Sequence, residues 1–502
     1  MHRQLRICGS RCRRTPLRAE VPAALLLWLL AASGPAPGTP PPPGGAPTVT
    51  APTTPGEEQT PPAPAGRRSG LLRQSYLLGD LGGLREKLSK YGISLYLAET
   101  SEVLGNVTGG VRRGAKYDGV TVADVQLDTQ RAFAHHGGTF NASLLQIHGS
   151  NLSAENLYTL QTASGIEADR ATRLWELWYQ QKFLEEDRLD VKVGQQSLDQ
   201  EFMVSLNGLV FVNTMFGWPM APSADLPGGG PAYPLSALGV RVRTRPTDAI
   251  TVLAGVFNGS PVSNNNGDPQ RENANGLRFP LNGGALVIAE VQYLYPALGT
   301  MVYADRPAPK PGLYKLGAYY DTEDFADEEF GTDGLSLANP ASSGVPRTHH
   351  GNYGLYGVVD QLVWLSPDDP DRTLSFFARA VGQPQSDRNL ISLGVNVGFV
   401  LRDPLHLRDE DTFGVGLGYA RVTDGASALD RDTNYFSGNS APIRSSETFI
   451  EATYQYQYAP WCQIQPDIQY VFNPGGDIAS PNASGQRIGD ELVIGTRVNI
   501  LF

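Results

Sequence analysis

Hydrophobic and polar residues alternate with a period of two along the later part of the chain. In the segment 491–502, ELVIGTRVNILF, one face is almost wholly apolar and ends on Phe502, whereas the other carries Glu491, Arg497 and Asn499. A strand with this pattern has hydrocarbon on one side and water on the other. The pattern therefore predicts an outer-membrane β-barrel, with a soluble β-sandwich as the alternative.

The same alternation, interrupted by Gly, Pro, Asn and Asp, extends back to residue 93. We predict strands at 93–104, 120–133, 138–148, 170–184, 188–198, 235–246, 249–258, 284–296, 311–321, 353–365, 372–382, 390–401, 411–423, 446–458, 462–473 and 490–502. The fold class is therefore all-β, a transmembrane antiparallel β-barrel of about 16 strands. Three glycines alternate with large residues between Phe413 and Tyr419. Because such inward positions are small, we expect an aqueous lumen without a packed apolar core.

The first 69 residues differ in composition from the rest. Residues 1–36 combine six arginines with a short apolar run, 21–32, which is typical of a cleaved signal peptide. Residues 37–69 are rich in proline and are predicted to form a disordered linker. Residues 70–502 are predicted to form the barrel domain, beginning with a short helix over 77–91 that Asp80 caps.

Two predicted connections are too long for simple turns. Residues 202–234 are apolar, aromatic and rich in Pro and Gly, and residues 322–352 are acidic and then rich in Gly and Ser. Long connections in a compact protein are usually functional. We expect 202–234 to fold inward and narrow the lumen, and 322–352 to form a solvated external loop.

Composition argues against several function classes. The formal net charge of −11 argues against nucleic-acid partners and against an anion-selective surface. Beyond the signal peptide only Cys462 remains, so we expect no disulfide framework and no cysteine-based metal site. The adjacent pairs His135–His136 and His349–His350 point to opposite faces of a strand, and no nucleotide-binding or nucleophile motif is found. We predict no enzyme activity, no catalytic residue, no cofactor and no metal.

The start of the predicted barrel domain resembles a known family. LGDLGGLR at 78–85, followed by Leu88 and the pair Gly92-Ile93, is similar to the entry signature of the carbohydrate-selective porins, the OprB-like family. Tyr117-Asp118-Gly119, RLWEL at 173–177 and VGQ at 193–195 also match, although many members have lysine at the position of Gln195. The resemblance covers 70–502. It implies a sixteen-stranded outer-membrane barrel through which small sugars pass by passive diffusion.

A sugar-selective pore needs hydrogen-bonding groups for hydroxyls and an aromatic ring for the apolar face of the sugar. We expect the lumen or its constriction to contain Glu99, Arg112, Asp118, Asp124, Glu176, Trp178 and Gln180. Trp178 shares a face with Glu176 and Gln180. Because a period of two sends neighbouring odd and even positions to opposite faces, we expect Trp175 to point away from the lumen.

The resemblance implies small neutral sugars as solutes and a bacterial outer membrane as the location, with lipids around the barrel. The apolar end strand predicts recognition of Phe502 by the barrel-assembly machinery. Sixteen-stranded porins often form trimers, so a homotrimer is the oligomer to test, although the sequence does not reveal the oligomeric state. The alternatives are a general porin, a porin for anions or other solutes, and a soluble all-β binding protein.

Overall fold

The structure is a computed structural model that describes residues 74–263, 267–281, 283–297, 310–369, 371–405, 410–483 and 485–502. The predicted signal peptide at 1–36 and linker at 37–69 lie outside the described residues. Sixteen strands form one closed antiparallel barrel, in which each strand pairs with its neighbours in sequence and β1 pairs with β16. The predicted fold class and strand number are confirmed.

The barrel strands are β1 Ile93–Thr108, β2 Gly114–Asp128, β3 Gly138–Gly149, β4 Ala171–Phe183, β5 Leu189–Gln196, β6 Ala237–Thr244, β7 Ile250–Asn258, β8 Ala285–Tyr295, β9 Gly312–Gly331, β10 Pro346–Leu365, β11 Thr373–Gly382, β12 Ile391–Arg402, β13 Thr412–Val422, β14 Ser446–Ala459, β15 Cys462–Phe472 and β16 Glu491–Leu501. The α-helices are α2 Leu84–Ser89, α3 Thr129–Phe133, α4 Met220–Asp225, α5 Pro269–Glu272, α6 Asp424–Ser437 and α7 Pro474–Asp477.

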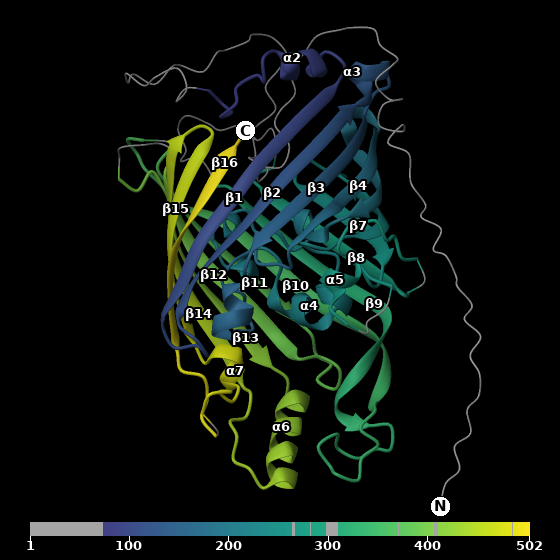
Figure 1. Cartoon of the computed structure of the whole chain (residues 1–502). Coiled ribbons are helices and arrows are strands. Elements are labelled where there is room, and N and C mark those ends of the chain that lie inside the picture. Colours follow the sequence, from purple (N-terminus) through teal and green to yellow (C-terminus); the bar gives the residue numbers. More distant parts are fainter. Residues whose placement is uncertain are drawn as a thin grey trace, which may run out of the picture.

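The two ends of the barrel differ (Figure 1). One end carries α2, α3 and the C-terminus, and the other carries α6, α7 and the extended β9–β10 hairpin. Within the described part of the chain, no helix has the length and apolar character needed to cross a bilayer. The first helix is shorter than predicted, because residues before Leu84 form turns, although the Asp80 carboxylate still accepts a hydrogen bond from Glu86 N at 3.0 Å.

Two predicted boundaries are wrong for local reasons. β2 ends at Asp128, because the Asp128 side chain accepts a hydrogen bond from Arg131 N and begins helix α3. The predicted external loop at 322–352 is mostly strand, since β9 continues to Gly331 and β10 begins at Pro346. Acidic residues are compatible with this hairpin because it extends beyond the rest of the barrel into solvent (Figure 1).

The main apolar core lies inside the barrel, which corrects the expectation of an unpacked lumen. Phe211 and Phe216 stack with ring centroids 4.3 Å apart, and Phe216 meets the wall residue Phe449 edge-on at 5.4 Å. The inward glycines of β13 make this packing possible. A Cβ on Gly416 would lie 2.6 Å from the Phe216 ring, so a larger residue would displace that ring. The glycines therefore accommodate a segment inside the barrel rather than open water.

Candidate channel site

The connection between β5 and β6, residues 197–236, lies inside the barrel, and we call it the lumen connection. It contains α4 and four short 3₁₀ turns, η4 Leu198–Gln200, η5 Gly208–Val210, η6 Thr214–Phe216 and η7 Pro227–Gly229. It contacts the inner wall at strands as far away as β10, β11 and β14. The prediction that 202–234 folds inward is confirmed.

A carboxylate on β10 holds one turn of the lumen connection. Asp360 accepts hydrogen bonds from Ser205 Oγ at 2.7 Å, from Leu206 N at 3.1 Å and from Asn207 N at 3.1 Å. The Asn207 side-chain amide adds a fourth bond at 2.8 Å. Hydrogen bonds to a charged acceptor are stronger than neutral ones. Asp360 therefore fixes this turn against the wall.

Two further wall residues hold the rest of the lumen connection. The Arg379 guanidinium on β11 donates to Met203 O at 2.9 Å and to Gly217 O at 2.6 Å. Glu451 on β14 accepts from Val212 N at 2.6 Å. The backbone of the lumen connection forms many hydrogen bonds within itself. Buried groups such as Met203 O, Gly217 O and Val212 N still need partners outside it. Arg379 and Glu451 of the wall supply them.

A second group of charged residues lies on the inner faces of β5 and β6 and on the segments that adjoin them. We call it the cationic cluster, and it consists of Lys192, Arg241, Arg243, Arg245, Asp190 and Glu201. Arg241 pairs with both carboxylates, and its Nε lies 2.6 Å from Glu201 Oε2. Lys192 also pairs with Glu201, and Arg243 Nε lies 2.7 Å from Asp190 Oδ2. The two carboxylates are therefore shared among more cations than they can neutralise.

The protonation of Glu201 follows from this setting. Burial raises the pKa of the Glu201 carboxyl, but Lys192 and Arg241 outweigh burial and lower the pKa to about 2. Glu201 is therefore ionised at neutral pH. Glu201, which belongs to the lumen connection, thus adds a negative charge to the cationic cluster.

Three of the seven predicted lumen residues lie beside the cationic cluster. The Lys192 ammonium lies 4.7 Å from the centre of the Trp178 ring, and Trp178 Nε1 donates to Glu176 Oε2 at 3.3 Å. Arg241 donates to Gln180 Oε1 at 3.3 Å. The structure thus brings Glu176, Trp178 and Gln180 together on the inner face of β4.

The orientation of Trp175 differs from the prediction. The pairing of β3 with β4 passes from Ser143–Glu176 to Leu144–Leu174, so Trp175 has no partner and forms a bulge. A bulge adds one residue and shifts the alternation of faces. Trp175 therefore points inward as well, where it meets Tyr233 of the lumen connection edge-on at 6.3 Å. Gln195 stabilises the bulge by donating to Trp175 O at 2.9 Å.

Three other predicted residues face inward or lie at the rim, but away from the cluster. Asp124 is buried on β2, where it accepts from Gln126 at 3.3 Å. Asp118 is buried nearer the start of β2, where it pairs with Glu102 of β1. Arg112 lies in the β1–β2 connection, donates to Glu155 Oε2 at 3.3 Å and keeps 60% of its side chain exposed. Arg112 is a rim residue in this structure.

The predicted inward position of Glu99 is wrong. Glu99 shares a face of β1 with Val103, which is 52% exposed, whereas Glu102 and Leu104 on the opposite face are 1% exposed. The register from Ala98 to Asn106 is continuous, so no bulge reverses the faces. Glu99 therefore lies on the outward face of the barrel. Val103 and the nearby leucines of the same face were the sequence signal for this orientation.

The sequence prediction missed most of the cationic cluster. Lys192 and Arg241 face each other in the β5–β6 ladder, and the adjacent outward positions are valines, of which Val193 and Val240 are 48% and 42% exposed. This alternation was a usable signal for both cations. Glu201 had none, because its contact with β5 and β6 depends on the path of the lumen connection.

The inner wall of β14–β16 carries neutral amides. Asn499 Nδ2 donates to Gln463 Oε1 at 3.0 Å, and Gln463 donates to Gln457 Oε1 at 3.3 Å. Gln465 and Gln455 donate to Val210 O of the lumen connection at 2.8 and 3.2 Å. The lumen thus combines a charged sector at β4–β6 with a row of amides on β14–β16, where Glu451, Asp467 and Arg497 lie farther along the same wall.

Known proteins share both the sequence and the fold. A family model described as "Carbohydrate-selective porin, OprB family" matches residues 112–502. Porin B of Pseudomonas aeruginosa is 24% identical over 450 residues, which cover 85% of this chain and 91% of that protein.

Among solved structures, the high-pH structure of Pseudomonas putida OprB aligns with a TM-score of 0.72 at 24% identity, covering 87% of this chain and 100% of that one. The low-pH structure of the same protein aligns with a TM-score of 0.52 at 19% identity, covering 86% and 99%. These structural likenesses show a shared barrel fold.

Proposed function

Because this chain belongs to the carbohydrate-selective porin family, the OprB family, we propose that sugars cross its barrel beside the Trp178 ring. The protein is an outer-membrane sugar porin of a bacterium, a channel rather than an enzyme. The observation that carries the proposal is the position of Trp178, partly exposed on the inner wall between the Lys192 ammonium and the Glu176 carboxylate.

The two sectors of the lumen suit a neutral polyol. A sugar that leaves bulk water needs donors and acceptors for its hydroxyls, and each Gln or Asn amide offers both. The amides of β14–β16 supply them without a net charge, and the Trp178 ring supplies an apolar surface for the C–H face of a pyranose. Binding must stay weak for solutes to leave, and partly exposed groups meet that condition.

We expect Trp178→Ala to slow sugar entry, because the variant loses the stacking surface while the pore keeps its charges. Initial rates of liposome swelling in glucose and in a disaccharide measure the effect, and single-channel recording in KCl measures ion flow. Stacking of a nucleobase on an aromatic side chain contributes about 1–3 kcal/mol. If a sugar ring gains about 1 kcal/mol from Trp178, its loss should lower the entry rate roughly fivefold. Ion conductance should change little.

Trp175→Ala is the control for that measurement. Trp175 also points inward, but it packs against Tyr233 and lies with Val120, Leu145 and Ile147 under the lumen connection. Its loss should affect stability more than flux. Equal sugar rates for Trp178→Ala and the unchanged protein would rule out stacking at this position.

A general or other-solute pore remains the competing function. The two differ in selectivity, since a general pore passes solutes according to size alone. Flux of glucose well above that of a polar solute of equal size supports the sugar porin. Equal flux of the two supports the general pore.

We propose further that the chain self-associates, as the expected homotrimer, through the outward faces of β1–β3. Glu99 on this face accepts a hydrogen bond from Ser101 Oγ at 3.0 Å, pairs with Thr121 Oγ1 and lies 3.4 Å from His148 Nε2. Tyr117 Oη bonds His148 at 3.1 Å. Outward positions of a barrel normally face lipid, where a charged group is costly. A second copy of the chain would cover this polar network.

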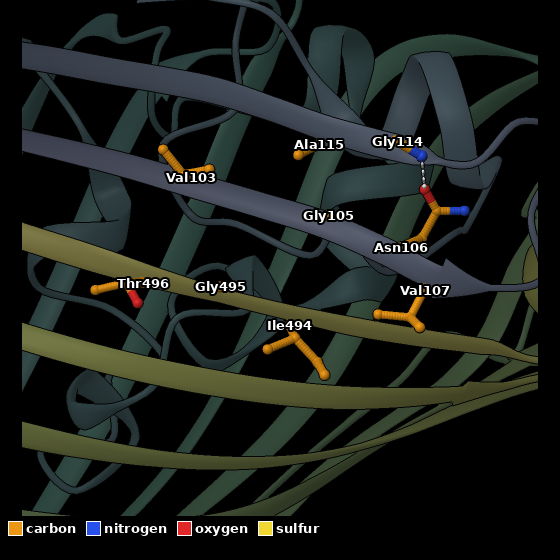
Figure 2. A pocket seen from close by; sticks show the side chains of 9 residues that line it. All are labelled: Val103, Gly105, Asn106, Val107, Gly114, Ala115, Ile494, Gly495 and Thr496. Carbon is orange, nitrogen blue, oxygen red and sulfur yellow. Dashed lines mark hydrogen bonds between the residues drawn. The ribbon is translucent and has the colours of Figure 1, made fainter.

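A hollow beside this polar network also supports self-association through the same surface. It has a volume of about 470 Å³ and crosses the seam between β16, β1 and β2 (Figure 2). Gly105 and Ala115 leave it open between the side chains of Val103, Val107 and Ile494. Small residues allow a close approach of neighbouring membrane segments.

The triple replacement Glu99→Leu, Thr121→Val and His148→Leu should shift the protein toward monomers, because the altered face becomes compatible with lipid. Native mass spectrometry of the detergent-solubilised protein measures the oligomeric state. Val291→Leu on the outward face of β8 is the control and should not change it. A monomeric unaltered protein in lipid nanodiscs would contradict the proposal.

We also propose that lipids surround the remaining outward faces and that Phe502 presents the closing strand to the barrel-assembly machinery. Phe502 N donates to Leu97 O at 2.9 Å, and Arg85 donates to Phe502 O. Leu77 N donates to Leu501 O at 2.8 Å. These bonds can form only once β16 has reached β1, so Phe502 is available to a partner until the barrel closes.

A further inference from the structure

The inner wall at β6 carries a row of cations. Arg241 and Arg243 are two positions apart on β6, so they share its inner face, with Cα atoms roughly 6.6 Å apart. Arg245 follows directly after this strand, and its guanidinium donates to Glu186 O at 3.3 Å. Arg241 is buried, with 2% of its side chain exposed, whereas Arg243 keeps 44% exposed. The row thus leads from the buried ion pairs to groups that a solute can reach.

The cationic cluster carries more positive than negative charge. Three of its four cations, Lys192, Arg241 and Arg243, share the carboxylates of Asp190 and Glu201. The Glu176 carboxylate also interacts with Lys192, which leaves four cations against three carboxylates. Among the described residues, no carboxylate lies within ion-pair distance of Arg245. The formal charge of the whole chain, −11, does not reverse this local excess, because charges in water are screened within about 8–10 Å.

A cavity of about 420 Å³ opens onto this row. Arg243, Arg245 and Lys315 line it together with the neutral donors Gln292 and Thr251. Such a volume lies within the range of about 300–1,000 Å³ that small-molecule sites occupy. A monosaccharide can therefore contact the row and neutral polar groups at the same time.

The neighbouring charges are largely paired with one another. Lys315 Nζ donates to Val204 O at 2.7 Å and lies 4.0 Å from Glu290. Arg188 pairs with Glu186 and Asp248 at 2.7 and 2.9 Å. The remaining lining carboxylate, Asp187, lies 3.3 Å from Lys182 and 3.0 Å from His136. None of these residues cancels the excess on β5 and β6.

We propose that the channel prefers a monosaccharide that carries a carboxylate, such as a hexuronate, over the neutral sugar of the same size. The planar guanidinium of Arg243 matches the geometry of a carboxylate. Asp190 pairs with its Nε, while 44% of the Arg243 side chain is exposed and the residue lines the cavity. The carboxylate of a solute would therefore meet a partly engaged cation. The solute is therefore held at Arg243 only briefly, as transport requires. This inference rests on the proposed function.

The test compares potassium glucuronate with glucose. The two sugars differ at C6, which is a carboxylate in glucuronate and an alcohol in glucose. The purified full-length protein is reconstituted in planar bilayers, and the zero-current potential under a glucuronate gradient gives the permeability ratio of glucuronate to potassium. Liposome swelling gives the entry rates of glucose and of potassium glucuronate under the same conditions. We expect Arg243→Gln to lower the glucuronate ratio by roughly twofold to fivefold, the range for exposed charge contacts. The glucose rate should fall less, because a glutamine side chain can still form hydrogen bonds with sugar hydroxyls.

Two further variants complete the test. Arg402→Gln removes another exposed cation, at the end of β12, and it should leave the glucuronate ratio unchanged. Arg243→Lys keeps the charge and should retain most of the preference. Equal effects of Arg243→Gln and Arg402→Gln, or glucuronate entering no faster than glucose, would overturn the inference while leaving the sugar porin intact. Entry of neither solute would overturn the proposed function as well.

Discussion

Replacing Asp360 by leucine is expected to free part of the lumen connection and to raise the single-channel conductance. The Asp360 carboxylate accepts four hydrogen bonds from Ser205, Leu206 and Asn207. Each buried donor that loses its partner costs about 1–3 kcal/mol. A total on the order of 3 kcal/mol shifts the equilibrium between the attached and detached turn by more than a hundredfold. Planar-bilayer recording measures the conductance, and heat-modifiable migration on gels shows that the barrel is folded.

Asp411→Leu is the matched control for this prediction. Asp411 is a buried carboxylate that accepts from Tyr454 Oη at 2.8 Å and from Gln457 N at 3.0 Å, and both partners belong to β14 rather than to the lumen connection. We expect no rise in conductance for this variant. If Asp360→Leu folds and keeps the original conductance, the carboxylate does not hold the connection in place.

Replacing Val415 by arginine is expected to destabilise the folded barrel by about 2–4 kcal/mol if Val415 lies near the middle of the bilayer. Val415 is 39% exposed on the outward face of β13, where it pairs with Phe399 and Ala452. Lipid cannot solvate a guanidinium there. Equilibrium unfolding in lipid vesicles measures the free energy of unfolding.

An arginine that faces the lumen should be tolerated, and Gln463→Arg provides that comparison. Gln463 lies on the inner wall of β15 among other amides, so its replacement remains hydrated. A stability equal to that of the unchanged protein is expected. Equal loss of stability in both variants would show that the cost arises from disturbed packing and not from lipid exposure.

The sequence revealed those features of the fold that repeat along a strand. Alternation located all sixteen strands and placed Val415 on the lipid side. Boundaries were less certain where a side chain ended a strand, as Asp128 does by capping α3. The acidic composition of 322–352 indicated solvent, but solvent exposure does not distinguish a loop from a hairpin that extends beyond the barrel. Local composition therefore gave the environment of this segment and not its backbone conformation.

The candidate site was predictable only in part. Glu176, Trp178 and Gln180 were found because they follow the alternation within β4. Trp175 was misplaced because one bulged residue reverses that alternation, and the bulge depends on pairing with β3 rather than on the local sequence.

By itself, the sequence determined the barrel, its sixteen strands and the family, because each rests on local periodicity or on motifs within one segment. Only the tertiary structure decided how Glu201 reaches Lys192 and Arg241, how Asp360 and Arg379 hold the lumen connection, and that Phe216 fills the space above Gly416. These contacts join residues far apart in the chain. They form because buried backbone groups and charges inside a barrel need partners, and those partners are found wherever the closed wall brings them.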